Sequence, residues 1–217
     1  MKLIGQTIMA ILFCGFGFLG FCGDNPQVII RTELGDITVE VFEQKAPITA
    51  GNFLEYVDKG LFNDCSFYRT VTMDNQPDND IKIEVIQGGL GADEGERRLP
   101  PITHETTEKT GILHQDGTIS LGRLDPGTAC SEFFICVGDQ PELDFGGRRN
   151  PDGQGFSAFG RVVEGMDIVR KIQMQPAKGQ SLDPQIKIFS IERIQEGASL
   201  LLLFGLLTGY SDKNNST

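Results

Sequence analysis

The chain has 217 residues, of which 39% are hydrophobic and 23% charged, and its formal net charge is −11. This length suits one domain with short appendages, and the composition is ordinary for a soluble globular protein. The negative charge argues against nucleic acid as a partner, because phosphate binding needs a basic surface. Glycine contributes 27 residues, which favours a turn-rich and largely β protein.

Residues 1–22 combine a basic start with an apolar run. Lys2 precedes an uncharged stretch from Ile8 to Phe21. This pattern predicts a secretory signal, since a membrane span needs about 20 apolar residues. Cys22 closes a sequence that resembles a bacterial lipoprotein box, although Phe21 departs from the small residue preferred there. We therefore expect an exported protein, periplasmic or attached to the envelope, with a membrane tether at the N-terminus if Cys22 is lipidated.

A domain is predicted over residues 28–195, after a short linker at residues 23–27. Its first two apolar segments, 28–32 and 37–42, flank a glycine-containing turn and predict a β-hairpin with one apolar face. Residues 46–57 predict an α-helix, because apolar side chains recur there at helical spacing and a glycine follows.

The rest of the domain continues the β pattern. Six further segments have the alternation or composition of strands: 66–71, 81–86, 117–121, 131–137, 156–163 and 186–194. A second helix is predicted over residues 165–172. The fold class is therefore mainly β, with an eight-stranded antiparallel barrel capped by two α-helices. The paired glycines after Gln87 predict a bulge or a close approach of two backbones.

The segment 131–137 displays a charge among apolar residues. On a strand, Glu132, Phe134 and Cys136 share one face, while Phe133 and Ile135 share the other. Both faces are largely apolar, which predicts burial on both sides. Glu132 is the exception.

Residue types that carry chemistry are sparse. Arg69 lies in a predicted strand, where an arginine usually faces solvent unless it is paired. His104 and His114 are the only histidines, and we expect both at the surface without a catalytic role. The cysteine spacing fits no zinc site, so we expect no metal and no disulfide framework, and we interpret Cys136 as a small core residue.

Three motifs occur in a specific order: Phe67-Tyr68-Arg69, Gln87-Gly88-Gly89 and Ser131-Glu132-Phe133-Phe134-Ile135. With these motifs the segment 28–194 resembles the cyclophilin-type peptidyl-prolyl cis-trans isomerases, of an exported, bacterial-like kind. The resemblance implies an eight-stranded barrel closed by two helices. It also implies an enzyme that interconverts cis and trans X-Pro bonds in proline-containing polypeptides and needs no cofactor.

The resemblance also implies roles for individual residues. Arg69 takes the position of the catalytic arginine, which donates to the twisted prolyl amide. Phe134 corresponds to the phenylalanine of the proline pocket. The full set of implied substrate-binding residues is Phe67, Val85, Gln87, Glu132, Phe134, Leu143 and Phe156. The implied task is to assist proline-limited protein folding.

The chain departs from the family pattern at several of these positions. Tyr68 replaces the commoner histidine, Val85 replaces a methionine, Glu132 replaces a glutamine, and Phe156 replaces a histidine of the pocket. We expect Glu132 beside Arg69, either orienting the guanidinium or occupying the donors that the amide needs. The alternative function is a non-catalytic proline-peptide binding module or chaperone.

Residues 196–217 form an apolar and then polar tail. At about 1.5 Å per residue, its apolar part is too short to cross a hydrocarbon core of about 30 Å. The tail could pack on the barrel, pair with another chain or touch a membrane surface, and of these we favour packing on the barrel. We expect the protein to be a monomer.

Overall fold

The computed structural model describes residues 25–91 and 95–195. The predicted signal at residues 1–22, the lipidation of Cys22 and the tail at residues 196–217 lie outside these ranges and stay predictions. Within the described ranges, no helix is long and apolar enough to cross a membrane.

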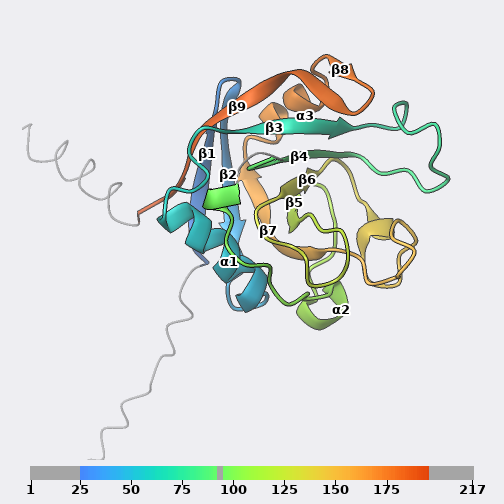
Figure 1. Ribbon diagram of the computed structural model, residues 1–217, viewed down its shortest axis with the longest axis horizontal. Helices are drawn as coiled ribbons and strands as arrows, with labels where there is room; N and C mark the ends of the chain where they lie inside the picture. The colour runs from blue at the N-terminus through green and yellow to red at the C-terminus, as the bar shows by residue number, and fades with distance from the viewer. Residues whose placement is uncertain (1–24, 92–94, 196–217) are drawn as a thin grey trace, which may run out of the picture.

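One antiparallel sheet forms the body of the domain. Its strand order is β1-β2-β7-β5-β6-β4-β3-β9-β8, and an additional pairing of β1 with β9 closes eight of the strands into a barrel (Figure 1). The strands are β1 Gln27–Thr32, β2 Gly35–Val41, β3 Cys65–Val71, β4 Val85–Gly89, β5 Thr118–Leu121, β6 Phe133–Cys136, β7 Ser157–Glu164, β8 Ala177–Lys178 and β9 Ser181–Arg193. The predicted eight-stranded barrel is confirmed.

Two longer helices lie against the barrel, as predicted. The α-helices are α1 Pro47–Asp58, α2 Thr107–Thr110 and α3 Met166–Gln173, and the 3₁₀ turns are η1 Gly95–Arg97 and η2 Pro141–Leu143. Helix α1 packs against β7 and β9, whereas α3 packs against β2, β3 and β4 (Figure 1). The single turn of α2 is too short to leave a periodic apolar signal in the sequence.

An aromatic cluster fills the barrel. Phe53 of α1 contacts Phe62, Phe133 and Phe159, with ring centroids 4.8–5.8 Å apart. Phe133 and Ile135 belong to this core. Phe134 and Cys136 face the opposite side of β6 and join a smaller buried cluster with Val71, Ile83, Val85 and Leu143. The alternation predicted for this strand is therefore confirmed.

The predicted strand at 81–86 is wrong over residues 81–84. The side-chain amide of Gln76 donates to the carbonyl oxygen of Ile83 and accepts from its backbone N–H, at 2.8 Å and 3.3 Å. The backbone of Ile83 is thereby satisfied without a partner strand, and β4 begins only at Val85.

The final strand is longer than predicted. It begins at Ser181 rather than at residue 186 and pairs with β8 in a hairpin. Pro184 hides this extension in the sequence, because proline cannot donate a hydrogen bond to a sheet ladder.

Candidate active site

Arg69 lies in the middle of β3, where its neighbours come from two adjoining strands. It is in register with Gln87 of β4 and Ser181 of β9. Its Nη1 donates to Oε1 of Gln87 at 2.7 Å, and its Nε and Nη2 donate to Oε1 of Gln180 at 3.0 Å and 2.6 Å. A guanidinium has five N–H donors, so two of them make no hydrogen bond within the described residues. Burial lowers the pKa of Arg69 from its ordinary value.

A cavity of about 100 Å³ opens beside this arginine. It is lined by both apolar and polar residues: Arg69, Ile83, Val85, Gln87, Gly122, Arg123, Phe134, Leu143 and Phe156. The rings of Phe134 and Phe156 meet edge to face, with centroids 5.2 Å apart. Six residues implied by the resemblance thus come together, whereas Ile83, Gly122 and Arg123 were not foreseen.

Phe67 does not line this cavity. Its side chain is completely buried in the barrel and contacts Phe133 edge to face, with centroids 5.8 Å apart. The structure therefore corrects the prediction that Phe67 binds substrate. Simple alternation would put Phe67 and Arg69 on the same face, but the register of β3 shifts between these two residues, so Phe67 faces the core while Arg69 lines the cavity.

Glu132 makes no contact with Arg69, contrary to expectation. One carboxylate oxygen, Oε2, accepts from the hydroxyl of Tyr68 at 2.6 Å. The other, Oε1, accepts from Nη2 of Arg98 at 3.0 Å. Tyr68 in turn accepts from Nε2 of Gln87 at 2.9 Å. Glu132 is therefore two side chains away from the arginine, and neither of the two expected direct roles holds.

The paired glycines of β4 allow the backbones beside the site to approach closely, as predicted. A Cβ atom on Gly88 would lie 2.8 Å from the carbonyl oxygen of Ser66. Gly89 has φ +135°, and a Cβ there would lie 2.8 Å from Oε2 of Glu132. Any larger residue at either position would push β3 or Glu132 away from Gln87.

Residues 27–193 match the family model described as "Cyclophilin type peptidyl-prolyl cis-trans isomerase/CLD". The chain belongs to this family. It is 33% identical to peptidyl-prolyl cis-trans isomerase A of Dickeya dadantii over 173 residues, which cover 79% of this chain and 83% of the relative. It is 35% identical to peptidyl-prolyl cis-trans isomerase B of Escherichia coli over 151 residues, covering 68% and 84%. Family and relatives identify the chain as a peptidyl-prolyl cis-trans isomerase, which favours the enzyme over the binding module.

A solved structure shares the fold. A cyclophilin-type isomerase of Cryptosporidium parvum, crystallised in the presence of the dipeptide Ala-Pro, superposes with a TM-score of 0.63 at 21% identity. The match covers 78% of this chain and 99% of that one.

His114 of this cyclophilin is buried, which corrects the prediction of a surface histidine. Its Nδ1 lies 2.7 Å from Oδ1 of Asp144 and its Nε2 lies 3.0 Å from Oγ of Ser120. This order of groups resembles a nucleophilic triad, but Ser120 is fully buried and out of reach of a substrate. The imidazole instead stacks on Phe134, with centroids 5.9 Å apart, and so supports the floor of the cavity.

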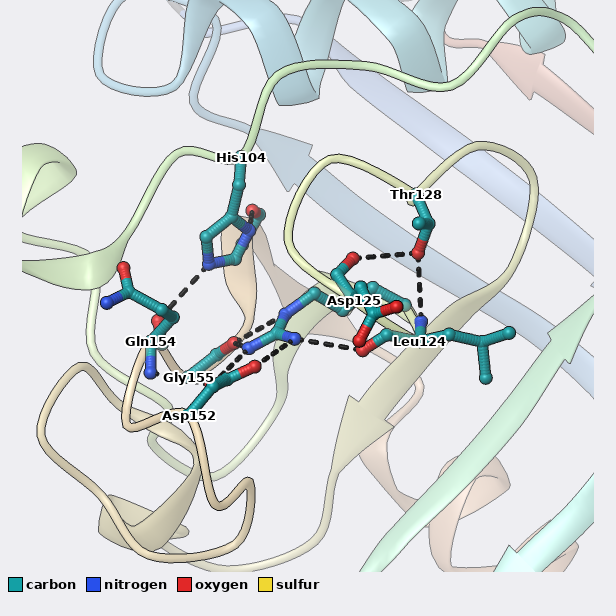
Figure 2. A network of polar contacts seen from close by, with 9 residues as sticks. His104, Leu124, Asp125, Thr128, Asp152, Gln154 and Gly155 are labelled. Carbon is teal, nitrogen blue, oxygen red and sulfur yellow. Dashed lines mark hydrogen bonds and ion pairs between the residues drawn. The ribbon is translucent and has the colours of Figure 1, made fainter.

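Arg123 joins the loops at the far side of the cavity. Its side chain is completely buried, donates to both carboxylate oxygens of Asp152 at 2.8 Å and 2.9 Å, and donates to the carbonyl oxygen of Gly155. It also donates to the carbonyl oxygen of Leu124 (Figure 2). Its guanidinium lies over the ring of Phe156, 5.4 Å from the centroid. The sequence marked this residue only as part of a loop, because its partners are far away in the chain.

His104 is half-buried, so its predicted surface position is only partly right. Its Nε2 lies 3.2 Å from the carbonyl oxygen of Gln154 (Figure 2), and its Nδ1 lies 2.8 Å from Oγ of Ser157. Burial lowers the pKa of His104.

The cysteines of the described residues are free thiols. Cys65 and Cys136 are buried and Cys130 is half-buried. Burial raises the pKa of Cys65 to about 12, and Cys136 is a core residue as predicted. Within residues 25–91 and 95–195, no group of three His, Cys, Asp or Glu side chains is arranged to hold a metal ion.

Proposed function

We propose that Arg69 catalyses isomerisation by donating a hydrogen bond to the prolyl amide nitrogen as the bond twists. The barrier is about 18–20 kcal/mol because the amide nitrogen is conjugated with the carbonyl. Twisting breaks the conjugation and returns a lone pair to that nitrogen, which then accepts a hydrogen bond. The observation that carries this proposal is the pair of uncommitted N–H groups on Arg69 at the wall of the cavity.

The cavity suits a proline ring. Phe134, Leu143 and Phe156 supply an apolar wall in the same cavity that Arg69 lines. An apolar and poorly hydrated site strengthens a hydrogen bond that forms only in the transition state. Gln87 and Gln180 hold the arginine in place before the substrate arrives, so little reorganisation is needed. The Ala-Pro dipeptide named for the Cryptosporidium relative supports proline-containing peptides as substrates.

The first test compares wild type with Arg69→Ala in a protease-coupled assay on an Ala-Pro peptide. Loss of the donor is expected to lower kcat/KM by about 10²-fold. Arg31→Ala is the matched control, since Arg31 is an exposed arginine paired with Asp36 and Glu192, and none of these three residues lines the cavity. Equal rates for wild type and Arg69→Ala would defeat the mechanism.

We further propose that the enzyme assists proline-limited folding of exported or envelope proteins. The apolar run in residues 1–22 supports export. Mass spectrometry of the mature N-terminus tests the export and the anchoring that this proposal requires. A lipid-modified Cys22 is expected for the anchored form, and an unmodified terminus beyond Cys22 would exclude lipidation. Retention of residues 1–22 in the mature protein would contradict cleavage of a signal.

A further inference from the structure

A line of side chains leads from Arg69 away from the cavity. Nη1 of Arg69 donates to Gln87, Nε2 of Gln87 donates to the hydroxyl of Tyr68, and that hydroxyl donates to Glu132. The three distances are 2.7 Å, 2.9 Å and 2.6 Å. Tyr68 and Glu132 are both departures from the family pattern, and the structure shows that they contact each other.

The donors and acceptors of these groups allow only one direction for the hydrogen bonds along this line of side chains. An ionised carboxylate has only acceptors, so the Tyr68 proton must point toward Glu132. The hydroxyl oxygen is then left to accept, and it takes an N–H from Gln87. Once the amide nitrogen of Gln87 is committed there, its carbonyl oxygen must face Arg69. A flipped amide would set an NH₂ group against the N–H of the guanidinium.

Glu132 is itself held in place. Its Oε1 accepts from Arg98 at 3.0 Å and from Oγ of Ser131 at 3.0 Å. The side chain is only 17% exposed. Burial, followed by the charge of Glu132, raises the pKa of Tyr68, so the hydroxyl keeps the proton that it donates.

We propose that Glu132 and Tyr68 are positioning residues that fix the amide orientation of Gln87 and, through it, the guanidinium of Arg69. This inference rests on the proposed catalytic role of Arg69. Neither Glu132 nor Tyr68 lines the cavity, so the pair acts on the arginine and leaves the apolar wall unchanged.

Glu132→Gln tests the direction of the hydrogen bonds. The new amide can donate to the Tyr68 oxygen, and the hydroxyl can then donate to Oε1 of Gln87 and draw it away from Arg69. We expect kcat to fall about tenfold with KM nearly unchanged, because the proline pocket is intact. Glu164→Gln, an exposed glutamate at the end of β7, is the matched control and is expected to behave like wild type. Unchanged or increased turnover in Glu132→Gln would overturn the proposal.

A double-mutant cycle tests whether the two residues act together. Tyr68→Phe removes the hydroxyl and is also expected to lower kcat about tenfold. The combined Tyr68→Phe and Glu132→Gln variant is expected to lower kcat no more than either substitution alone. Each substitution already breaks the same series of hydrogen bonds from Glu132 through Tyr68 and Gln87 to Arg69, which we call the relay. Losses that multiply to about a hundredfold would show independent roles and overturn the relay.

A reversed relay keeps the proposal testable if Tyr68→Phe fails to fold. In a variant combining Gln87→Glu with Glu132→Gln, the new carboxylate accepts from both Arg69 and Tyr68, while the new amide donates to the Tyr68 oxygen. This variant is expected to recover kcat relative to Glu132→Gln alone. A combined variant no faster than Glu132→Gln would count against the relay.

The Arg69→Ala result distinguishes the catalytic role of Arg69 from the positioning role of Glu132 and Tyr68. If Arg69→Ala turns over at the wild-type rate, the proposed function fails. If Arg69→Ala is slow while Glu132→Gln and Tyr68→Phe both match wild type, the catalytic arginine stands and the relay is overturned.

Discussion

At the scale of single residues, the site depends on polar groups that are buried only because they are paired. Arg123 is the clearest case, since its completely buried side chain is balanced by Asp152. An unpaired charge there would be strongly destabilising. Arg69 differs, because its hydrogen-bond partners Gln87 and Gln180 are neutral side chains.

His104 gives a prediction at this scale. Burial, the leading cause, lowers its pKa, and the charge of Arg123 acts in the same direction, whereas the contact with Gln154 and the charge of Asp152 oppose it. The unfolded chain therefore takes up a proton near pH 6.5 that the folded protein resists, and stability is lost as the pH falls below that value.

Thermal unfolding at pH 7 and pH 5 tests whether stability falls with pH in this direction. The Tm of wild type is expected to fall more between pH 7 and pH 5 than the Tm of His104→Gln, because the glutamine side chain cannot take up a proton. Parallel losses in the two proteins would show that another group causes the acid sensitivity.

At the scale of elements, the β8–β9 hairpin supplies a part of the site that the sequence did not reveal. Gln180 lies in its turn and accepts from both Nε and Nη2 of Arg69. Its amide nitrogen donates to the carbonyl oxygen of Asn75, at 3.2 Å, in the loop after β3. The hairpin therefore ties the arginine to a second loop.

Gln180→Ala is expected to lower kcat/KM about tenfold, because one edge of the guanidinium loses its acceptor. The control is Gln185→Ala, in β9 after the same turn, whose side chain accepts from the hydroxyl of Ser66 at the surface. Activity measured with the Ala-Pro peptide should separate the two variants. Equal activities would mean that Gln87 alone suffices to position Arg69.

Some features of the fold and the site could be predicted from the sequence and others could not, and the reason is physical. Period-two alternation is a local signal, so the sequence correctly assigned Phe133 and Phe134 to opposite faces of β6. Motif resemblance located most of the cavity for the same reason, since two of the motifs lie within β3 and β4 and the third leads directly into β6. Long-range pairings leave no local mark, and the partners of Arg123, Gln180 and Glu132 were therefore missed or misassigned.

Phe67 and His114 show a second limit. The resemblance assigned Phe67 to the site by its place in a motif, whereas the shift in register of β3 between Phe67 and Arg69 leaves Phe67 in the core. His114 was expected at the surface because no serine or cysteine partner for it could be identified from the sequence. Its burial depends on Asp144, which is 30 residues further along the chain.

At the scale of the whole molecule, one face of β6 contributes to the core of the barrel and the opposite face contributes to the cavity. Phe133 lies in the aromatic core with Phe53, Phe62 and Phe67. Phe134, the next residue, belongs to the smaller cluster at the cavity. The two faces of β6 thus serve different purposes.

Alanine substitution at the two positions is expected to show this separation. Phe133→Ala should lower the free energy of unfolding by about 3–5 kcal/mol, because it removes a ring from a packed core. Phe134→Ala should cost less stability, since its ring borders a cavity, but should lower kcat/KM more strongly in the protein that remains folded. Urea unfolding and the peptide assay measure the two effects, and the reverse order would refute the assignment of faces.

The closure of the barrel by β1 and β9 also brings the two ends of the domain together. Val28 is in register with Arg193, and the backbone N–H of Ile194 donates to the carbonyl oxygen of Gln27 at 2.8 Å. A short peptide linker could therefore join residue 195 to residue 25 and convert the domain into a circularly permuted chain with new ends at an exposed loop. For the same reason, a carrier or surface attached at either end would hold the domain by the same edge of the barrel.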